Sequence, residues 1–351
     1  MNAVTALDTV LGAPRAVLVR APNWVGDAIL AVPALCALRE AFPGAHLAVL
    51  AVPWVADVFR FVPAVDEIVL FDRKGRHRGL RGLWRLGREL ATRRFDVAIT
   101  QPRSASSAIL LGLTGIPTRV GYDGALQRPW LTHPVPFPGK GRPGIHEREL
   151  HLELLRGTGI PAPRSDPRLV TPAHVADAAA RALEASGIAG KPYVAIAPGA
   201  AFGGAKRWTA TGFAAVADRA YRETGLEAVL LGSPGERPIA RAVNAAARRA
   251  PVDLCGRIGL AEALAVIGGA RLLVTNDSGL MHAGAALGVP LVAVFGPTDA
   301  EATGPVGPST SVVSEPVACA PCFLRDCPID HRCMERIAPE RVWSAAQSLA
   351  F

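Results

Sequence analysis

A turn near residue 278 carries the residue types that bind phosphate groups. It follows the apolar, β-branched run 272–275 and precedes a helical pattern over 280–287. Its candidates are two good N-cap residues, a glycine that lets a ligand approach the backbone, and a histidine one turn later: Asp277, Ser278, Gly279 and His282. Free N–H groups and the positive dipole end of such a helix attract an anion. An ordinary capped crossover with a core histidine explains the same residues equally well.

A glycine-rich loop at 198–208 offers a second set of phosphate-binding residues. It lies between a strand predicted over 193–197 and a helix predicted over 209–223, and it includes Gly199, Lys206 and Arg207. Backbone N–H groups of glycines can close on phosphate oxygens while a lysine supplies charge. The loop is not a P-loop, because the G-x-x-x-x-G-K-[ST] spacing is missing.

Two acids begin helices directly after predicted strands. Asp27 follows the run 15–20 through Gly26, and Glu236 follows the run 227–231. As first-turn or capping acids they would stabilise their helices by ~1 kcal/mol each. At the carboxyl ends of parallel strands they would also face the crevice where open sheets bind ligands, and Glu236 could accept hydrogen bonds from ribose hydroxyls. Both interpretations stay open at this point.

The segment 73–94 is strongly basic. Its only acid is Glu89, and its cations are Arg73, Lys74, Arg76, Arg78, Arg81, Arg85, Arg88, Arg93 and Arg94. Leucines and a tryptophan recur at helical spacing over 80–90, which predicts a basic amphipathic helix preceded by a basic loop. Solvated helix faces usually mix signs, so this excess favours a phosphate- or carboxylate-rich partner. Arg103, on the turn after the strand predicted over 95–100, joins the candidates.

Four cysteines cluster late in the chain, at Cys319, Cys322, Cys327 and Cys333. A C-x-x-C pair followed by two more cysteines suits a tetrahedral thiolate site for structural zinc. Unliganded thiols in a loop, or an iron–sulfur cluster or redox pair, are the competing interpretations. None of them is expected to take part in catalysis.

Ala-rich helical segments alternate with Val, Leu and Ile runs, which predicts an α/β class with parallel sheets. The 351 residues, 50% of them hydrophobic, suffice for two cores, and the Pro-rich segment 160–172 is the best linker. The expected domains are 1–165 and 176–335, with a final helix in 336–351. Further strands are expected at 46–52, 67–71, 119–122, 252–254 and 289–295, helices at 28–42, 54–61, 146–157, 260–268 and 339–349, and an irregular stretch at 126–143.

Composition narrows the functional class. A net charge of +8 implies an anionic partner. Aromatic residues amount to 6% and do not interleave with the basic run, so stacking platforms for nucleic acid are lacking. No G-x-G-x-x-G follows the first strand of either half, which weakens a nicotinamide or flavin interpretation, and no D-x-D is present to hold a divalent metal on a diphosphate. Catalysis is therefore expected to need no metal or other cofactor.

Five stretches resemble, in order and spacing, the heptosyltransferases of glycosyltransferase family 9. They are APNWVGDAILAVPAL, APGAAFGGAKRW, LLGSPGER, LCGRIGLAEALAVI and VTNDSGLMHAGAALGVPLVAVFGPTD. The resemblance covers nearly the whole chain and implies a GT-B architecture, two Rossmann-like domains facing each other across a cleft. The first domain would bind the acceptor and the second the nucleotide sugar. The last helix would cross back to the N-terminal domain.

The resemblance also implies roles for individual residues. Asp27 stands at the family's catalytic base, Lys206 at the lysine on the donor diphosphate, and Glu236 near the acid on the ribose. Asp277, Ser278, Gly279 and His282 stand at the donor-binding turn, with Gly199 and Arg207 on the neighbouring loop. The cations expected to meet the acidic acceptor are Arg73, Lys74, Arg76, Arg78 and Arg103.

The implied reaction is inverting transfer of heptose from ADP-heptose to a heptose already on the Kdo–lipid A inner core of lipopolysaccharide. The alternatives are another family 9 enzyme with a different sugar or acceptor, and a non-catalytic nucleotide- or glycan-binding protein, which would lose the base at Asp27. A nucleic-acid partner is not expected. The N-terminus lacks a basic region followed by an apolar core, and no run approaches ~20 apolar residues, so a cytoplasmic protein at the inner face of the membrane is expected.

Overall fold

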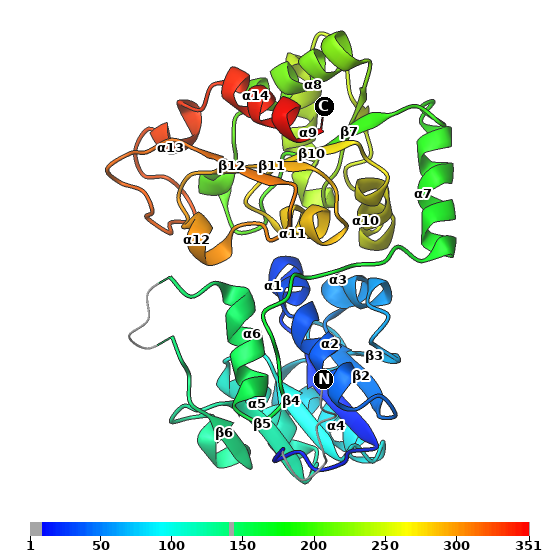
Figure 1. Ribbon diagram of the computed structural model, residues 1–351, viewed down its shortest axis with the longest axis vertical. Coiled ribbons are helices and arrows are strands. Elements are labelled where there is room, and N and C mark those ends of the chain that lie inside the picture. Colours follow the sequence, from blue (N-terminus) through cyan, green and yellow to red (C-terminus); the bar gives the residue numbers. More distant parts are fainter. Residues whose placement is uncertain (1–8, 140–143, 351) are drawn as a thin grey trace. The chain divides into compact units, whose positions relative to one another are not determined.

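The computed structural model describes residues 9–139 and 144–350, and the chain divides into two compact units, Met1–Pro167 and Arg168–Phe351 (Figure 1). The first eight residues, the end of the irregular stretch expected at 126–143, and Phe351 of the final segment lie outside the described residues. The Pro-rich segment 160–172 has no helix or strand. In the described ranges, every helix is too short or too polar to span a bilayer.

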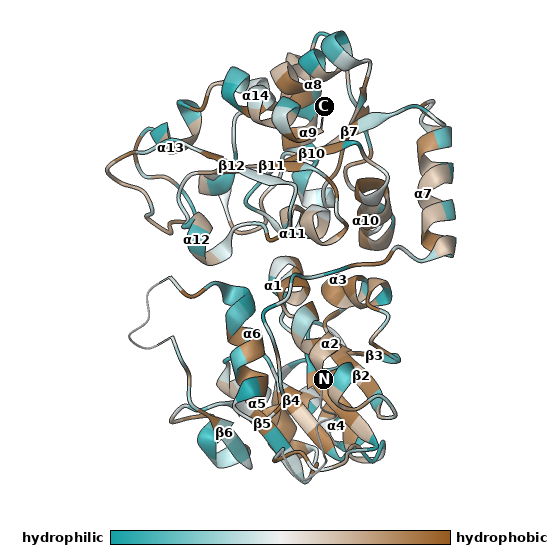
Figure 2. Cartoon of the chain, viewed as in Figure 1, coloured by the Kyte–Doolittle hydropathy of each residue, from teal (hydrophilic) through white to brown (hydrophobic). Residues whose placement is uncertain are grey.

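The first unit contains a six-stranded, wholly parallel sheet in the order β3-β2-β1-β4-β5-β6. This is the doubly wound Rossmann order, in which strands are added to one side of β1 and then, from β4 on, to its other side. The central strands are apolar and buried, as both faces of a parallel sheet must be, and Figure 2 shows hydrophobic residues along β2 and β4. The strands are β1 (Ala16–Arg20), β2 (His46–Ala51), β3 (Glu67–Leu70), β4 (Val97–Thr100), β5 (Thr118–Tyr122) and β6 (His133–Val135).

Helices connect these strands. They are α1 (Val25–Leu30), α2 (Val32–Ala41), α3 (Pro53–Ala56), α4 (Gly79–Ala91), α5 (Ala105–Leu113) and α6 (Glu147–Arg156), with 3₁₀ turns η1 (Asp57–Phe61) and η2 (Arg128–Trp130). The single helix expected over 28–42 is wrong in one respect. It divides at Ala31, where Pro33 near the start of α2 cannot donate a backbone hydrogen bond to the preceding turn. The stretch expected to be irregular contains η2 and the edge strand β6.

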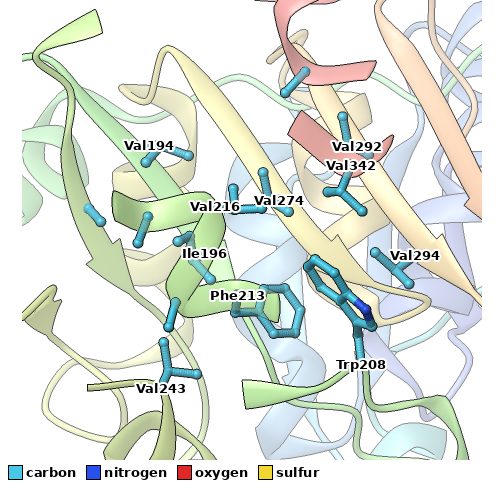
Figure 3. Packing of buried hydrophobic residues seen from close by; sticks show 14 of the residues in the cluster. Val194, Ile196, Trp208, Phe213, Val216, Val243, Val274, Val292, Val294 and Val342 are labelled. Atoms are coloured by element: carbon cyan, nitrogen blue, oxygen red, sulfur yellow. The ribbon is translucent and has the colours of Figure 1, made fainter. Parts of the chain in front are cut away.

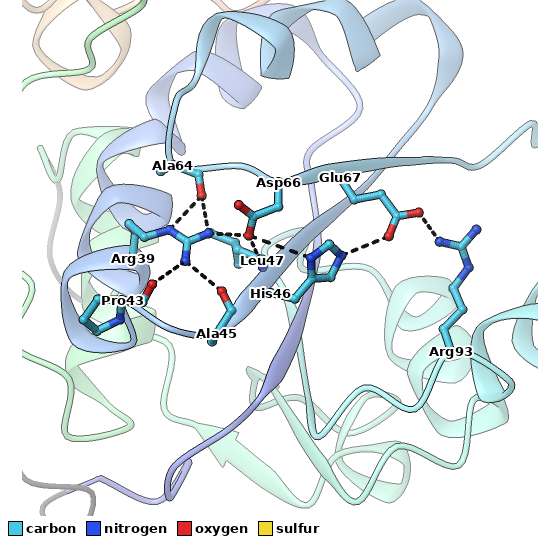
Figure 4. A network of polar contacts seen from close by, with 9 residues as sticks. All are labelled: Arg39, Pro43, Ala45, His46, Leu47, Ala64, Asp66, Glu67 and Arg93. Atoms are coloured by element: carbon cyan, nitrogen blue, oxygen red, sulfur yellow. Dashed lines mark hydrogen bonds and ion pairs between the residues drawn. The ribbon is translucent and has the colours of Figure 1, made fainter.

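A polar network ties the end of α2 to the starts of β2 and β3 (Figure 4). The Arg39 guanidinium donates to the backbone oxygens of Ala45 at 2.7 Å and Ala64 at 3.0 Å, and it pairs with Asp66. Asp66 also accepts from the Leu47 N–H at 2.7 Å. Burial opposes ionisation of Asp66, but the Leu47 N–H and Arg39 outweigh it and lower its pKa.

The second unit repeats the same topology, with the strand order β12-β11-β10-β7-β8-β9 and the reversal between β7 and β10. Its strands are β7 (Tyr193–Ala197), β8 (Glu227–Leu230), β9 (Val252–Asp253), β10 (Leu272–Asn276), β11 (Leu291–Phe295) and β12 (Thr310–Ser314). Its helical elements are α7 (Ala173–Ala185), η3 (Gly204–Lys206), α8 (Ala210–Thr224), η4 (Pro234–Glu236), α9 (Arg237–Ala246), α10 (Leu260–Gly268), α11 (Gly279–Ala286), α12 (Ala300–Thr303), α13 (Arg332–Glu335) and α14 (Pro339–Ala350).

One hydrophobic cluster of the second unit lies between α8, α14 and one face of the sheet (Figure 3). Trp208 and Phe213 meet edge to face, with ring centroids 5.0 Å apart, among strand valines such as Val274 and Val292. The expectation that the last helix crosses to the first domain is corrected here. Helix α14 packs on α8, β11 and β12 of its own unit, because Val342 and Trp343 on its apolar side complete this core.

Candidate functional site

The two loops predicted to bind phosphate meet at one edge of the second sheet. Strands β7 and β10 are parallel neighbours, with Ala197 opposite Thr275 in the register. The glycine-rich loop leaves the end of β7, and the turn at Asp277 leaves the end of β10. The order in which strands are added to the sheet reverses between β7 and β10. Open α/β sheets bind ligands at such a point.

Asn276 fastens the glycine-rich loop to the sheet at both of the loop's ends. Its Oδ1 accepts from the Trp208 N–H at 2.9 Å, and its Nδ2 donates to the Pro198 carbonyl at 2.8 Å. The Trp208 indole is buried and donates to the Ile337 carbonyl at 3.1 Å. The loop is therefore held by side chains that are themselves fixed, which is what a preorganised binding site requires. No sequence pattern predicted this role for Asn276.

Lys206 and Asp277 form an ion pair between the two loops. The Lys206 Nζ lies 2.5 Å from Asp277 Oδ2, which also accepts from the Thr298 hydroxyl at 2.6 Å. Both side chains are largely buried, at 13% and 6% exposed. The ammonium also lies 5.0 Å from the centroid of the Phe202 ring. Asp277 therefore orients the lysine, rather than capping α11 as its sequence position suggested.

Ser278 occupies the N-cap position of α11, but its side chain makes no capping hydrogen bond. Its hydroxyl lies instead 3.2 Å from that of Thr275. Since the first turn of a helix leaves N–H groups without intrahelical partners, this turn keeps donors for an anionic ligand. His282 lies one turn further on and is buried within the helix.

Glu236 lies against the glycine-rich loop. A Cβ atom on Gly199 would stand 1.9 Å from Glu236 Oε1, so a side chain at this position would displace the Glu236 carboxylate. The other carboxylate oxygen, Oε2, accepts from the N–H and hydroxyl of Ser233, at 2.7 and 2.8 Å. This capping box confirms the structural interpretation of Glu236 and still leaves Oε1 facing the loop. The buried Nε of Arg207 has no hydrogen-bond partner among the described residues.

The cysteine-bearing segment 319–333, here called the Cys loop, packs on the glycine-rich loop. The Arg325 carbonyl accepts from the Ala205 N–H at 2.8 Å, and the His331 Nε2 donates to the Ala205 carbonyl at 2.7 Å. A Cβ on Gly203 would stand 2.3 Å from the Arg325 oxygen, so the two backbones are in close contact. The backbone N–H and carbonyl of Ala205, the residue before Lys206, are thus both hydrogen-bonded to the Cys loop. Sequence reasoning missed this, because no local pattern signals a contact across ~125 residues.

The four thiols are free, and Cys319 and Cys322 are exposed while Cys333 is buried. Burial, and then the neighbouring Cys319 and Cys327, raise the pKa of Cys333. Among the described residues, no three His, Cys, Asp or Glu side chains are placed as metal ligands. A zinc site on these cysteines stays a prediction.

Asp27 lies in the first turn of α1, at the carboxyl edge of the first sheet, and is partly exposed. The turn before it is braced from two sides. The buried Arg20 side chain donates to the Ala21 carbonyl and the Asn23 amide oxygen, and the Trp54 indole donates to the Asn23 carbonyl at 2.9 Å. Burial, and next the charge of Arg73, lower the pKa of Arg20 to about 9, so it stays charged at neutral pH. Arg20 is a functional candidate that its strand pattern concealed.

The basic loop leaves β3 at the same edge of the first sheet. Asp72 shapes it, accepting from the N–H groups of Gly75 and Arg76 at 2.9 Å each. Arg76 pairs with Glu89 at 2.6 Å, and the Lys74 ammonium lies 4.8 Å from the centroid of the Trp54 ring.

The remaining acceptor candidates are two exposed arginines and one arginine that lies near an acid. Arg73 and Arg78 are exposed on the basic loop. Arg103, after β4, stacks 4.5 Å from the Phe137 ring and lies 3.6 Å from Glu147. Because all strands of the first sheet are parallel, Asp27, the basic loop and Arg103 share its carboxyl edge.

Residues 83–332 match the model of glycosyltransferase family 9 (heptosyltransferase), which is well over half of the chain. The chain belongs to this family. A lipopolysaccharide heptosyltransferase 2 of Salmonella typhimurium is 30% identical over 304 residues, covering 85% of this chain and 87% of the relative. The solved structure of the Escherichia coli ADP-heptose lipopolysaccharide heptosyltransferase II superposes with a TM-score of 0.80 at 28% identity, covering 95% of this chain and 98% of that one.

These matches confirm the GT-B fold class and make this family 9 protein a glycosyltransferase. They do not separate the numbered activities within the family. A lipopolysaccharide heptosyltransferase 1 of Pseudomonas aeruginosa is also 28% identical, over 89% of this chain and 87% of the relative.

Proposed function

We propose that the protein is a lipopolysaccharide heptosyltransferase II, which transfers heptose from ADP-heptose to the heptosyl–Kdo–lipid A inner core. The Salmonella typhimurium relative and the Escherichia coli structure, each matched over most of its length, carry this activity in their names. The observation that carries the donor half of the proposal is the ion pair of Lys206 and Asp277, seated beside the open first turn of α11. An ammonium and helix N–H groups at one point suit a diphosphate.

The donor site would act mainly through electrostatics. When the glycosidic bond to ADP breaks, negative charge grows on the β-phosphate. Lys206 and the first turn of α11 would stabilise that charge, with Arg207 supplying a second cation nearby. Glu236 would accept from the ribose hydroxyls through Oε1, the oxygen beside Gly199. His282, within α11, would line the same turn.

Asp27 would act as general base toward the acceptor hydroxyl. Such a hydroxyl is a weak nucleophile, and a positioned base contributes roughly 10² to 10⁴-fold to the rate. A carboxylate has a reference pKa of ~3.9, so it is ionised at neutral pH and needs orientation more than tuning. The braced turn at Asn23 supplies that orientation.

The acceptor is anionic, and the exposed cations of the first unit are suited to it. Arg73, Lys74 and Arg78 project from the basic loop, while Arg76 and Arg103 are partly neutralised by Glu89 and Glu147. We expect the first three to contribute most to acceptor recognition, since an unshared charge retains more attraction for a phosphate.

Transfer assays with defined donors and acceptors would test the proposal. The donors are ADP-heptose, ADP-glucose and UDP-glucose, and the acceptors are Kdo–lipid A carrying no, one or two heptoses, with products followed by mass spectrometry. Addition to the one-heptose acceptor alone, from ADP-heptose alone, is the expected result, and it should survive EDTA because no metal is expected to hold the diphosphate. Addition to the heptose-free acceptor would assign the first-heptose activity, and ADP binding without any transfer would favour a non-catalytic nucleotide-binding protein.

A further inference from the structure

Helix α4 exposes apolar side chains on the side that faces away from the core. Leu86 and Leu90 are buried in the core cluster with strand residues of the first sheet. On the other side, Leu80 is 86% exposed and Trp84 is 58% exposed. Side chains four residues apart share one side of a helix, so these two form a continuous apolar ridge in water. Neighbouring exposed apolar side chains with a polar rim are a feature of interaction surfaces.

Arginines surround that ridge. Arg81, Arg85 and Arg88 follow at spacings that place them on the same side of the helix, and all are exposed. The Arg88 guanidinium stacks 5.5 Å from the Trp84 ring centroid. We call Leu80, Arg81, Trp84, Arg85 and Arg88 the α4 outer face.

The one acid of the basic segment does not offset this charge. Glu89 is bound by Arg76 at 2.6 Å and by the buried His77 at 3.3 Å. The basic loop that leads into α4 adds Lys74, stacked on the 40% exposed Trp54. The surface therefore carries an excess of positive charge, with apolar and aromatic groups set among the charges.

We propose that the α4 outer face docks on an anionic lipid bilayer. Leu80 and Trp84 enter the boundary between headgroups and acyl chains, where tryptophan is favoured, and the arginines bind lipid phosphates while their stems follow the apolar groups inward. A nucleic acid or a soluble anionic sugar would satisfy the arginines but would leave Leu80 in water. A bilayer is the partner that uses both the charge and the ridge. The inference deepens the proposed function, since a lipid-linked acceptor lies in such a surface.

Sedimentation with lipid vesicles would test the docking without any lipopolysaccharide present. The full chain should bind vesicles of phosphatidylcholine with phosphatidylglycerol and should not bind phosphatidylcholine alone. The double variant Leu80→Ser with Trp84→Ser should bind at least tenfold more weakly. The triple variant Arg81→Gln, Arg85→Gln, Arg88→Gln should lose the preference for anionic lipid. Leu126→Ser removes a leucine that is 71% exposed elsewhere in the same unit and should bind like the unchanged protein.

Three outcomes would overturn the docking surface. They are no binding to anionic vesicles, equal binding by the Leu80 and Trp84 double variant, and binding to a single-stranded RNA at least as tight as to the vesicles. A transfer assay separates this inference from the proposed function. The double variant should keep full transfer to a deacylated, water-soluble acceptor and lose transfer to the acceptor in vesicles. Vesicle binding by a protein that transfers heptose to neither acceptor would leave the docking standing and the proposed function refuted.

Discussion

Lys206 forms an ion pair with Asp277, and this pair determines how the lysine would contact a ligand. Its partner Asp277 is anchored by Thr298 and lies almost entirely out of solvent. The pair keeps a buried ammonium at the end of β10, where an unpaired charge would be costly. In the proposed function, a bound diphosphate would share the lysine with Asp277, and the lysine would need little rearrangement.

Replacing Lys206 with alanine should weaken ADP binding by at least tenfold, because a charge-assisted contact is worth ~1.5–3 kcal/mol. Titration calorimetry with ADP measures the loss. Lys191→Ala is the matched control, since Lys191 is an exposed lysine of the same unit that pairs with Glu227. Equal ADP affinity in the Lys206 and Lys191 variants would remove Lys206 from the donor site.

Asp27→Ala should lower kcat by at least ~10² while leaving ADP affinity nearly unchanged, because the acceptor hydroxyl loses its base. Steady-state kinetics and calorimetry on the same preparation separate the two effects. Asp57→Ala removes another first-turn acid in the first unit and controls for a purely structural role. Near-normal turnover by the Asp27 variant would assign this carboxylate to the helix alone.

At the scale of elements, the Cys loop acts as the outer support of the glycine-rich loop. Ala205 donates one hydrogen bond to the Cys loop and accepts another from it. Lys206 is the next residue after Ala205. Arg325 and Lys206 also stack on the same ring, Phe202, at 5.2 and 5.0 Å. A change in the Cys loop should therefore alter the position of Lys206 at the proposed diphosphate site.

His331→Ala should weaken ADP binding several-fold without changing the pH profile of kcat, because it releases the Ala205 carbonyl but removes no reacting group. His331→Gln, which keeps a donor, should recover part of the affinity. Arg332→Ala, next to it but paired with Asp330, is the control. The supporting role would be refuted by an alanine variant with unchanged ADP affinity.

The sequence predicted the elements that carry strong local signals. The strands of both sheets other than β6 and β12, the basic helix α4, and the turns at Asp27, Lys206 and Ser278 were all predicted from apolar runs and capping residues. Strand β12 escaped notice because Thr310–Ser314 is half polar, as an edge strand is allowed to be. Helix α7 escaped because it follows a Pro-rich stretch and buries only Val175 and Ala179. Local patterns identify elements but not their long-range partners.

The candidate site shows the same limit. Residue types and spacing pointed to Lys206, Asp277 and Glu236, but the ion pair of Lys206 with Asp277 and the approach of Glu236 to Gly199 come from tertiary packing. Arg20 ends a strand of ordinary appearance, and only the fold turns its guanidinium back onto Asn23. The support from His331 was equally invisible, since it joins segments far apart in the chain.

At the scale of the whole molecule, pH should affect the first unit through a buried histidine. His151 lies in α6, and its Nε2 has no hydrogen-bond partner within the described residues. Burial, and then the charge of Arg103, lower the pKa of His151 from 6.5 to about 4. The folded unit therefore keeps His151 neutral at pH values where the unfolded chain protonates it.

Stability contributed in this way is complete above pH 6.5 and falls as the pH drops toward 4, because the unfolded state then binds the extra proton. Between pH 7.5 and 5.0 the loss should be about 2 kcal/mol. Urea unfolding at both pH values should show this loss in the unchanged protein and not in His151→Leu. His174→Gln, which removes an exposed histidine, should retain it. An identical pH dependence in all three proteins would contradict the assignment.

The separate cores of the two units have a consequence for calorimetry. The cluster around Leu18, Ala98 and Leu110 is built entirely from the first unit, and the cluster around Trp208 entirely from the second. A ligand held by Lys206 and α11 stabilises only the half of the chain that binds it, by ~4 kcal/mol at a thousand times its Kd. Scanning calorimetry with rising ADP should therefore resolve two heat-absorption peaks, one moving to higher temperature and one staying fixed. A single peak that moves as a whole would mean that the two halves melt together.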